Sequence, residues 1–155
     1  MKTDRFLTGI LIGIGVLIVL SLALFFLRKE TVDYLPEDTP EGIVHNYVLA
    51  IERQDYERAY SYLAESETKP TYSAFRMAFI QKQVDPGRAI ADIGESEIFE
   101  DEAVVGITIT QGQFGLFSDP YRDIQSVLLV RQKDAWKIYQ APWPYWGWDW
   151  STPQK

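Results

Sequence analysis

The sequence PEGIVHNYVLAIERQDYERAYSYL, residues 40–63, contains the start signals of two consecutive helices. Thr39 is a favourable N-cap, and Pro40 suits the first helical position. The first helix should end near Arg53 and Gln54, and Asp55 then caps the second. Apolar residues recur at helical spacing and form one stripe on each helix: Ile43, Val44, Tyr47, Val48 and Ile51, then Tyr56, Ala59, Tyr60 and Leu63.

Downstream, the pattern changes from helical to alternating. A third helix is predicted over residues 71–83, and the turn Asp85-Pro86-Gly87 ends it. Four runs with the two-residue period of β-strands follow, over residues 89–99, 103–116, 121–131 and 135–141. Residues that share a face are Val105, Ile107 and Ile109 in the second run, and Ile124, Ser126, Leu128 and Val130 in the third. This order predicts an α+β fold in which three helices pack on an antiparallel sheet of about four strands.

Two short motifs resemble NTF2-like (SnoaL-like, cystatin-like) domains. Residues 54–60 (QDYERAY) match the turn between the first two helices of that family. Residues 134–138 (DAWKI) resemble its last strand, with Ala135 where glycine is common. The resemblance covers residues 39–142 and implies a curved sheet wrapped around a long helix, forming a cone with a pocket. Members include isomerases, dehydratases and non-catalytic modules, some anchored on bacterial membranes, so the resemblance leaves the function open.

The segment Phe6–Leu27 predicts a transmembrane helix. Its 22 residues carry no charge. At about 1.5 Å per residue a helix of this length spans roughly 33 Å, enough to cross a hydrocarbon core of about 30 Å. The apolar run continues past the small residues Ser21 and Ala23, so we expect an uncleaved signal-anchor. Residues 1–5 form a short flank, and residues 28–38 form a polar linker.

The flanking charges barely favour one orientation of this helix. Lys2 and Arg5 on one side oppose Arg28 and Lys29 on the other. Because a large domain after a first helix is usually exported, we expect a single-pass protein with a cytoplasmic N-terminus. Its domain would then lie on the periplasmic side of a bacterial cell envelope. The glycines at positions 9 and 13 have the spacing of a contact between membrane helices, although glycine is common in such helices in any case.

Composition excludes several classes of function. The chain has a formal net charge of −7, and residues 31–155 carry 11 basic and 20 acidic side chains, a net −9. Such a surface repels nucleic acid. The chain has no cysteine, which excludes disulfides and cysteine-ligated metals.

No pattern of residues predicts a catalytic, cofactor or metal site. The single histidine, His45, lies off the apolar stripe and should face outward. Asp92 is a lone carboxylate, which is weak support for acid–base chemistry. Arg76 and Arg122 could bind an anion if they point inward, but surface ion pairs are the favoured interpretation. The acidic residues between positions 95 and 102 lack the spacing of a calcium loop.

The tail, residues 143–155, is rich in tryptophan. Its prolines and glycine exclude a continuous helix or a central strand, and its rings are too apolar to remain in water. The tail could fold back on its own domain, lie in the membrane interface or dock on a partner; its own domain is the first expectation. The residues predicted to bind a partner are Trp143, Tyr145, Trp146, Trp148 and Trp150, with Gly9 and Gly13 in the membrane helix.

These features together predict a non-catalytic accessory or assembly subunit of a larger membrane complex for electron transfer or transport. Its partners would be other subunits of that complex, and lipid through residues 6–27. The alternative is a small-molecule-binding module, or an isomerase or dehydratase that uses the cone.

The predicted topology has a direct test. Protease added to intact spheroplasts should digest the domain after residue 38 and leave the Phe6–Leu27 segment in the membrane, because the bilayer shields only that segment. Digestion is followed with antibodies against each end of the chain. Protection of the domain until the membrane is permeabilised would show that the orientation is wrong.

Overall fold

The computed structural model describes residues 5–27, 33–87, 89–112 and 121–150. The chain divides into two compact units, Met1–Asp33 and Tyr34–Lys155. Each unit is described by itself.

The first unit contains one helix, α1 (Arg5–Leu27). Its bounds agree with the segment predicted from the sequence. Within the described part of the chain, no helix combines the length and apolarity needed to cross a bilayer. A Cβ atom added at Gly9 or Gly13 would meet nothing within 4 Å, so neither glycine is required by packing inside this chain.

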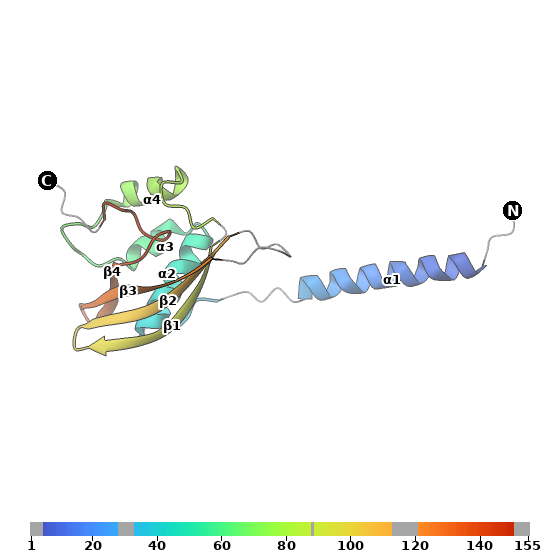
Figure 1. Ribbon diagram of the computed structural model, residues 1–155, viewed down its shortest axis with the longest axis horizontal. Coiled ribbons are helices and arrows are strands. Elements are labelled where there is room, and N and C mark those ends of the chain that lie inside the picture. Colours follow the sequence, from blue (N-terminus) through green and yellow to red (C-terminus); the bar gives the residue numbers. More distant parts are fainter. Residues whose placement is uncertain (1–4, 28–32, 88, 113–120, 151–155) are drawn as a thin grey trace. The chain divides into compact units, whose positions relative to one another are not determined.

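The second unit places its helices before its strands along the chain. The helices are α2 (Pro40–Glu52), α3 (Tyr56–Ser61) and α4 (Tyr72–Ile80). The strands β1 (Ile90–Phe99), β2 (Glu102–Gln111), β3 (Tyr121–Gln132) and β4 (Ala135–Gln140) form one antiparallel sheet in the order β1-β2-β3-β4 (Figure 1). This arrangement confirms the predicted α+β fold. The helix predicted over residues 71–83 is shorter than expected, and residues 113–116 of the second predicted strand lie outside the described residues.

Helix α2 is the centre of the core. Thr39 caps it by accepting a hydrogen bond from the Gly42 N–H, 3.1 Å away. Ten of its 13 residues are buried, so burial extends well beyond the predicted stripe, and the other three, Glu41, His45 and Glu52, lie on one side of the helix. His45 is half-buried on α2, not on an open surface, and it interacts with other groups of the chain.

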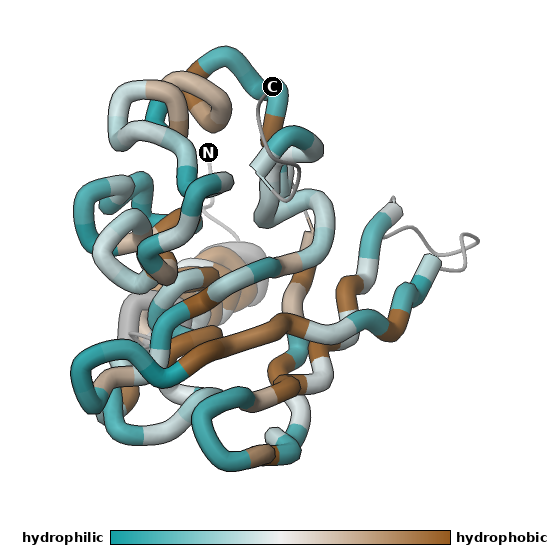
Figure 2. Tube along the Cα trace, turned by 90° about the vertical axis from the view of Figure 1, so that its left-hand side faces the viewer, coloured by the Kyte–Doolittle hydropathy of each residue, from teal (hydrophilic) through white to brown (hydrophobic). Residues whose placement is uncertain are grey.

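The sheet buries one face against this core. Figure 2 shows hydrophobic and polar residues alternating along the strands. In β2 the buried residues include Val105, Ile107 and Ile109, as their spacing indicated, and also Ala103 and Thr110. In β3 the buried face carries Val127 and Leu129. The opposite face of β3 also carries apolar residues at alternate positions, and there Ile124 is 82% exposed.

The segment before α2 is part of the domain, although the sequence suggested a linker up to residue 38. The side-chain amide of Asn46, which is fully buried, accepts a hydrogen bond from the Leu35 N–H at 2.7 Å and donates one to the Leu35 carbonyl at 2.8 Å. A carboxylate oxygen of Glu37 accepts hydrogen bonds from the Tyr62 hydroxyl at 2.7 Å and the Arg58 guanidinium at 3.1 Å. The polar linker is therefore shorter than residues 28–38.

These contacts make the stability of the domain depend on pH. The hydrogen bond from Tyr62, with the nearby Arg58 charge, lowers the pKa of Glu37 below its usual 4.5. The stabilisation of the folded domain by the Glu37 carboxylate is therefore complete above about pH 4.5. It is lost as the pH falls through the lowered pKa of Glu37 in the folded state. We expect Glu37→Gln to lower the melting temperature at pH 7 and to have a smaller effect at pH 3. Glu97→Gln, at an exposed strand position, is the control; an equal effect of both substitutions at pH 7 would contradict the assignment.

Candidate functional site

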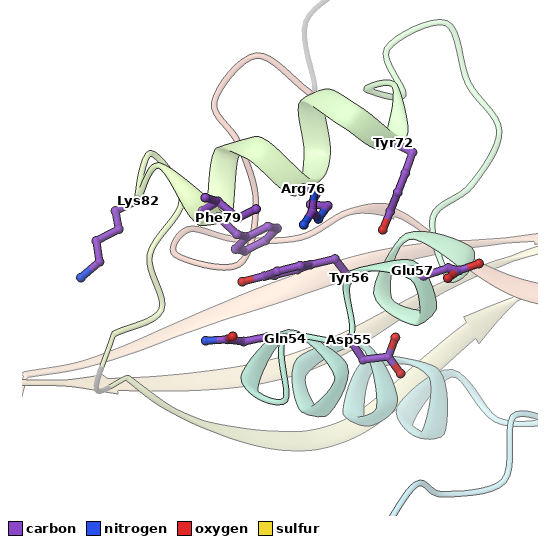
Figure 3. Close-up of a pocket in the computed structure, with 9 residues that line it drawn as sticks. Gln54, Asp55, Tyr56, Glu57, Tyr72, Arg76, Phe79 and Lys82 are labelled. Atoms are coloured by element: carbon purple, nitrogen blue, oxygen red, sulfur yellow. The ribbon is translucent and has the colours of Figure 1, made fainter.

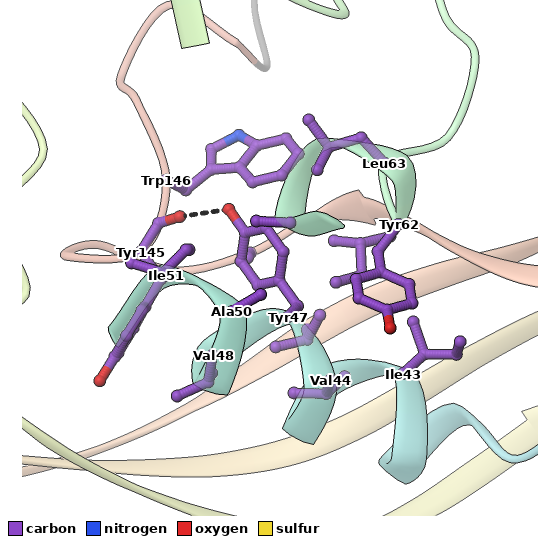
Figure 4. Packing of buried hydrophobic residues seen from close by; sticks show 14 of the residues in the cluster. Ile43, Val44, Tyr47, Val48, Ala50, Ile51, Tyr62, Leu63, Tyr145 and Trp146 are labelled. Carbon is purple, nitrogen blue, oxygen red and sulfur yellow. Dashed lines mark hydrogen bonds between the residues drawn. The ribbon is translucent and has the colours of Figure 1, made fainter. Parts of the chain in front are cut away.

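The C-terminal segment, residues 141–150, packs against α2 and α4. The Tyr47 hydroxyl donates a hydrogen bond to the Tyr145 carbonyl at 2.6 Å (Figure 4). The Trp150 ring lies 5.1 Å from the Phe75 ring and 5.4 Å from the Trp146 ring, centre to centre. The segment therefore supplies aromatic residues to the hydrophobic core, and the expectation that the tail folds on its own domain is confirmed for these rings.

Turns allow this irregular segment to be buried. The Tyr145 N–H donates to the Pro142 carbonyl at 3.0 Å, and the Trp150 N–H donates to the Gly147 carbonyl at 3.3 Å. Such bonds meet the need of buried backbone groups for partners. A Cβ atom at position 147 would lie 2.6 Å from the Trp150 ring, so only glycine lets that ring fold back on the turn.

The buried hydroxyl groups are not suited to proton transfer near neutral pH. Burial raises the pKa of Tyr47. Burial, with a contribution from the Glu52 charge, also raises the pKa of Tyr145. The Tyr145 hydroxyl is buried and has no hydrogen-bond partner among the described residues. These groups therefore remain protonated at neutral pH.

Two tryptophans of the same segment face the solvent. Trp143 is 43% exposed and Trp148 is 81% exposed; we call them the exposed tryptophan pair. Two open hollows of about 330 and 300 Å³ adjoin Trp148, one of them shared with Trp143 and the other with Met77 of α4. Exposed indoles beside hollows have the composition of a protein contact surface.

The structure separates the residues predicted to bind a partner into three groups. Tyr145, Trp146 and Trp150 are buried, so a partner could reach them only if the segment moved. Trp143 and Trp148 are accessible. Gly9 and Gly13 belong to the other unit, and their role as a helix contact stays a prediction.

The other candidates from the sequence do not converge on one site. Asp92 and Arg122 are exposed on β1 and β3, and Asp55 caps α3 by accepting from the Arg58 N–H at 3.2 Å. Within the described ranges, no group of three or more metal-ligating side chains is placed to hold an ion. Arg76 differs from these residues because it lines a groove between α3 and α4 (Figure 3).

Sequence reasoning missed this groove. The apolar stripe that includes Tyr56 predicts a residue facing the core, but Tyr56, together with Phe79, lines a hollow of about 610 Å³. The signal in the sequence was the helical spacing of Tyr72, Arg76 and Phe79, which places them along one side of a helix. Which neighbour that side would face depends on the tertiary fold.

Comparisons with known proteins give a similarity of fold only. No family model and no curated protein matches the chain. Among solved structures, the chain is similar to a protein from Thiobacillus denitrificans assigned as a calcium/calmodulin-dependent protein kinase type II association domain. The TM-score is 0.46 at 13% identity, over 64% of this chain and 89% of that one.

Two further structures are similar at the same level. RPA3114, a SEC-C motif protein from Rhodopseudomonas palustris, gives a TM-score of 0.49 at 9% identity, over 68% of this chain and 79% of that one. A protein from Campylobacter jejuni assigned as an NTF2-like transpeptidase gives 0.45 at 18% identity, over 66% and 99%. The neighbours thus include one with the NTF2-like name.

The buried and exposed tryptophans should differ in their effect on stability. Trp150→Ala removes a ring packed on Phe75 and Trp146, so it should lower the free energy of unfolding by about 3–5 kcal/mol. Trp148→Ala, which removes a ring that is 81% exposed, should change it by less than about 0.5 kcal/mol. Urea denaturation of the full chain in mild detergent, followed by circular dichroism, measures both. Equal effects would mean that the segment does not form part of the core.

Proposed function

We propose that the protein is a membrane-anchored accessory or assembly subunit of a larger membrane complex, with an NTF2-like domain and the C-terminal segment as its contact elements. The observation that carries the proposal is the use of residues 141–150 as core. The domain commits its own aromatic side chains to its interior and leaves the exposed tryptophan pair outside.

The packed interior favours this proposal over an enzyme that uses the cone. The resemblance implies a pocket between the sheet and the long helix. Here Tyr145, Trp146 and Trp150 pack in the same core as α2 and the inner face of the sheet. The hollows described above are open to solvent and lie along the surface, whereas an enzyme site usually encloses its substrate.

Exposed tryptophan gives the proposed contact its driving force. One indole can bury about 150–250 Å², which at about 25 cal/mol per Å² corresponds to roughly 4–6 kcal/mol before ordering costs. The net charge of −9 over residues 31–155 would disfavour other strongly acidic proteins at long range. The proposed partner therefore offers an apolar or weakly basic surface to the pair.

The proposed anchor is the uncharged segment Phe6–Leu27, with the domain on the periplasmic side. The support for it is the length and apolarity of the sequence itself. An anchor of this kind keeps the domain close to membrane-embedded subunits, which raises the effective concentration of a weak contact. In the same proposal, the larger complex carries out electron transfer or transport.

Replacement of the tryptophan pair tests the proposal. The full chain, purified from native membranes in mild detergent, should bring a defined set of membrane proteins with it. The double substitution Trp143→Ala with Trp148→Ala should reduce their recovery at least tenfold while circular dichroism and the melting temperature stay unchanged. Ile124→Ala, which is 82% exposed on the sheet, is the matched control. If the double substitution leaves the recovery of membrane proteins unchanged, or if the control reduces it equally, the role of the pair is overturned. If no protein co-purifies with any variant, the accessory function is overturned.

A further inference from the structure

The groove between α3 and α4 is a second candidate contact site, distinct from the tryptophan pair. Two hollows, of about 610 and 410 Å³, share four lining residues: Gln54, Tyr56, Phe79 and Lys82. They therefore form one elongated, open groove. It runs from the beginning of α3 to the turn after α4 (Figure 3).

Stacked aromatic rings fix one wall of the groove. The rings of Tyr56 and Phe79 lie 5.6 Å apart at an angle of 19°. Phe79 also contacts Phe75 and Trp150, with ring centres 5.1 and 6.2 Å away. Because the core holds these rings in place, a ligand would lose little free energy to ordering them.

Arg76 supplies a cation beside these rings. Figure 3 places Arg76 over Tyr56, between Phe79 and Tyr72. Among the described residues the Arg76 side chain has no ion pair or hydrogen bond, although the chain carries 22 acidic side chains. A planar guanidinium with unused donors is suited to a carboxylate, which it can hold through two parallel hydrogen bonds.

The carboxylates nearby do not neutralise this position. Asp55 is engaged as the cap of α3, where its carboxylate accepts a hydrogen bond from the backbone N–H of Arg58 at 3.2 Å. In Figure 3 it points away from α4, and Glu57 lies at the Tyr72 end of the groove. Lys82 lies at the opposite end, with its amine 4.0 Å from an Asp85 carboxylate oxygen. Glu52 and Asp85 also line the groove, and Asp85 pairs with Lys82, so among the described residues the unpaired positive charge of the groove is that of Arg76 in its middle.

Two residues of this groove adopt a backbone conformation that favours glycine. Gln54 has φ of 60° and Lys82 has φ of 58°, and each follows the C-terminal end of a helix. The next N–H reaches back into the helix in both cases, from Asp55 to the Ala50 carbonyl at 2.8 Å and from Gln83 to the Ala78 carbonyl at 2.9 Å. Glycine is the usual residue at such a position. Both side chains line the part of the groove that the two hollows share.

We propose that this groove binds a segment of a partner polypeptide in which one acidic side chain stands next to an aromatic one. The carboxylate would pair with Arg76, and the ring would lie on the wall formed by Tyr56 and Phe79. The proposal rests on the accessory function proposed above and names a second contact for it. Tyrosine and arginine are the residue types enriched at the energetic centres of protein interfaces. The acidic surface of the domain makes a single carboxylate in an apolar context a better match than a polyacidic segment.

A peptide titration tests the groove itself. The probe is Ac-Ala-Glu-Phe-Ala-NH₂, added to the ¹⁵N-labelled full chain in detergent micelles, with Ac-Ala-Gln-Phe-Ala-NH₂ as the uncharged counterpart. Amide shifts should concentrate at Tyr56, Arg76 and Phe79, and the glutamine peptide should bind at least tenfold more weakly. Arg76→Gln should weaken the glutamate peptide at least tenfold, whereas Arg122→Gln, at an exposed arginine of β3, should leave it unchanged. Equal binding of the two peptides, or equal binding by wild type and Arg76→Gln, would overturn the proposal.

Glycine substitutions separate binding from folding. Gln54→Gly and Lys82→Gly should each raise the melting temperature, because glycine relieves the left-handed backbone, and together they should weaken the glutamate peptide several-fold. A higher melting temperature with unchanged binding would mean that these side chains only tolerate their conformation, and would count against the groove.

The two proposals can fail separately. If membrane proteins co-purify equally with wild type and with Arg76→Gln, the accessory function stands and the groove is not part of the contact. If nothing co-purifies with wild type while the glutamate peptide binds with the stated selectivity, the groove is a peptide site and the accessory function is wrong.

Discussion

The burial of α2 around most of its circumference is the constraint on which the rest of the domain depends. A helix against a sheet normally keeps one polar face in water, but α2 buries ten of 13 residues. The sheet covers one side, and other parts of the chain must cover the rest. The segment before α2 does so by pairing its backbone with Asn46, and the C-terminal segment does so through Tyr47.

The polar groups on α2 follow from this constraint. A buried amide without partners is costly, but the Asn46 side chain accepts from the N–H and donates to the carbonyl of one residue, Leu35. Tyr47 buries its ring and still donates to the Tyr145 carbonyl. Each of these polar groups therefore forms hydrogen bonds with the backbone of a segment without regular structure. Without those bonds, the backbone groups would be buried and unpaired. This explains how two irregular segments can close a core that has only four strands and short helices.

Local signals in the sequence predicted most of the elements, because caps and alternation are local chemistry. Thr39, Asp55 and Thr71 all accept the capping hydrogen bonds that their residue types favour. Alternation located β3, but it could not decide whether Val127 or Ile124 faces inward, since both faces of that strand carry apolar residues. The tail was expected on its own domain because of its indoles, yet the division into buried Trp150 and exposed Trp148 depends on the turn at Gly147. The groove at Arg76 could not be predicted, because α3 and α4 meet only in the folded domain.

Helix α4 connects the two candidate surfaces. It has nine residues, too few to be stable as an isolated helix, so its position depends on packing. Trp150 supplies that packing through Phe75 and Phe79. Met77 lies on the hollow beside Trp148, and Arg76 lies on the groove beside Tyr56. A contact at either surface would therefore favour the same packed position of α4, and binding at one would reduce the ordering cost at the other. The aromatic core thus fixes the short helix that both proposed contacts share.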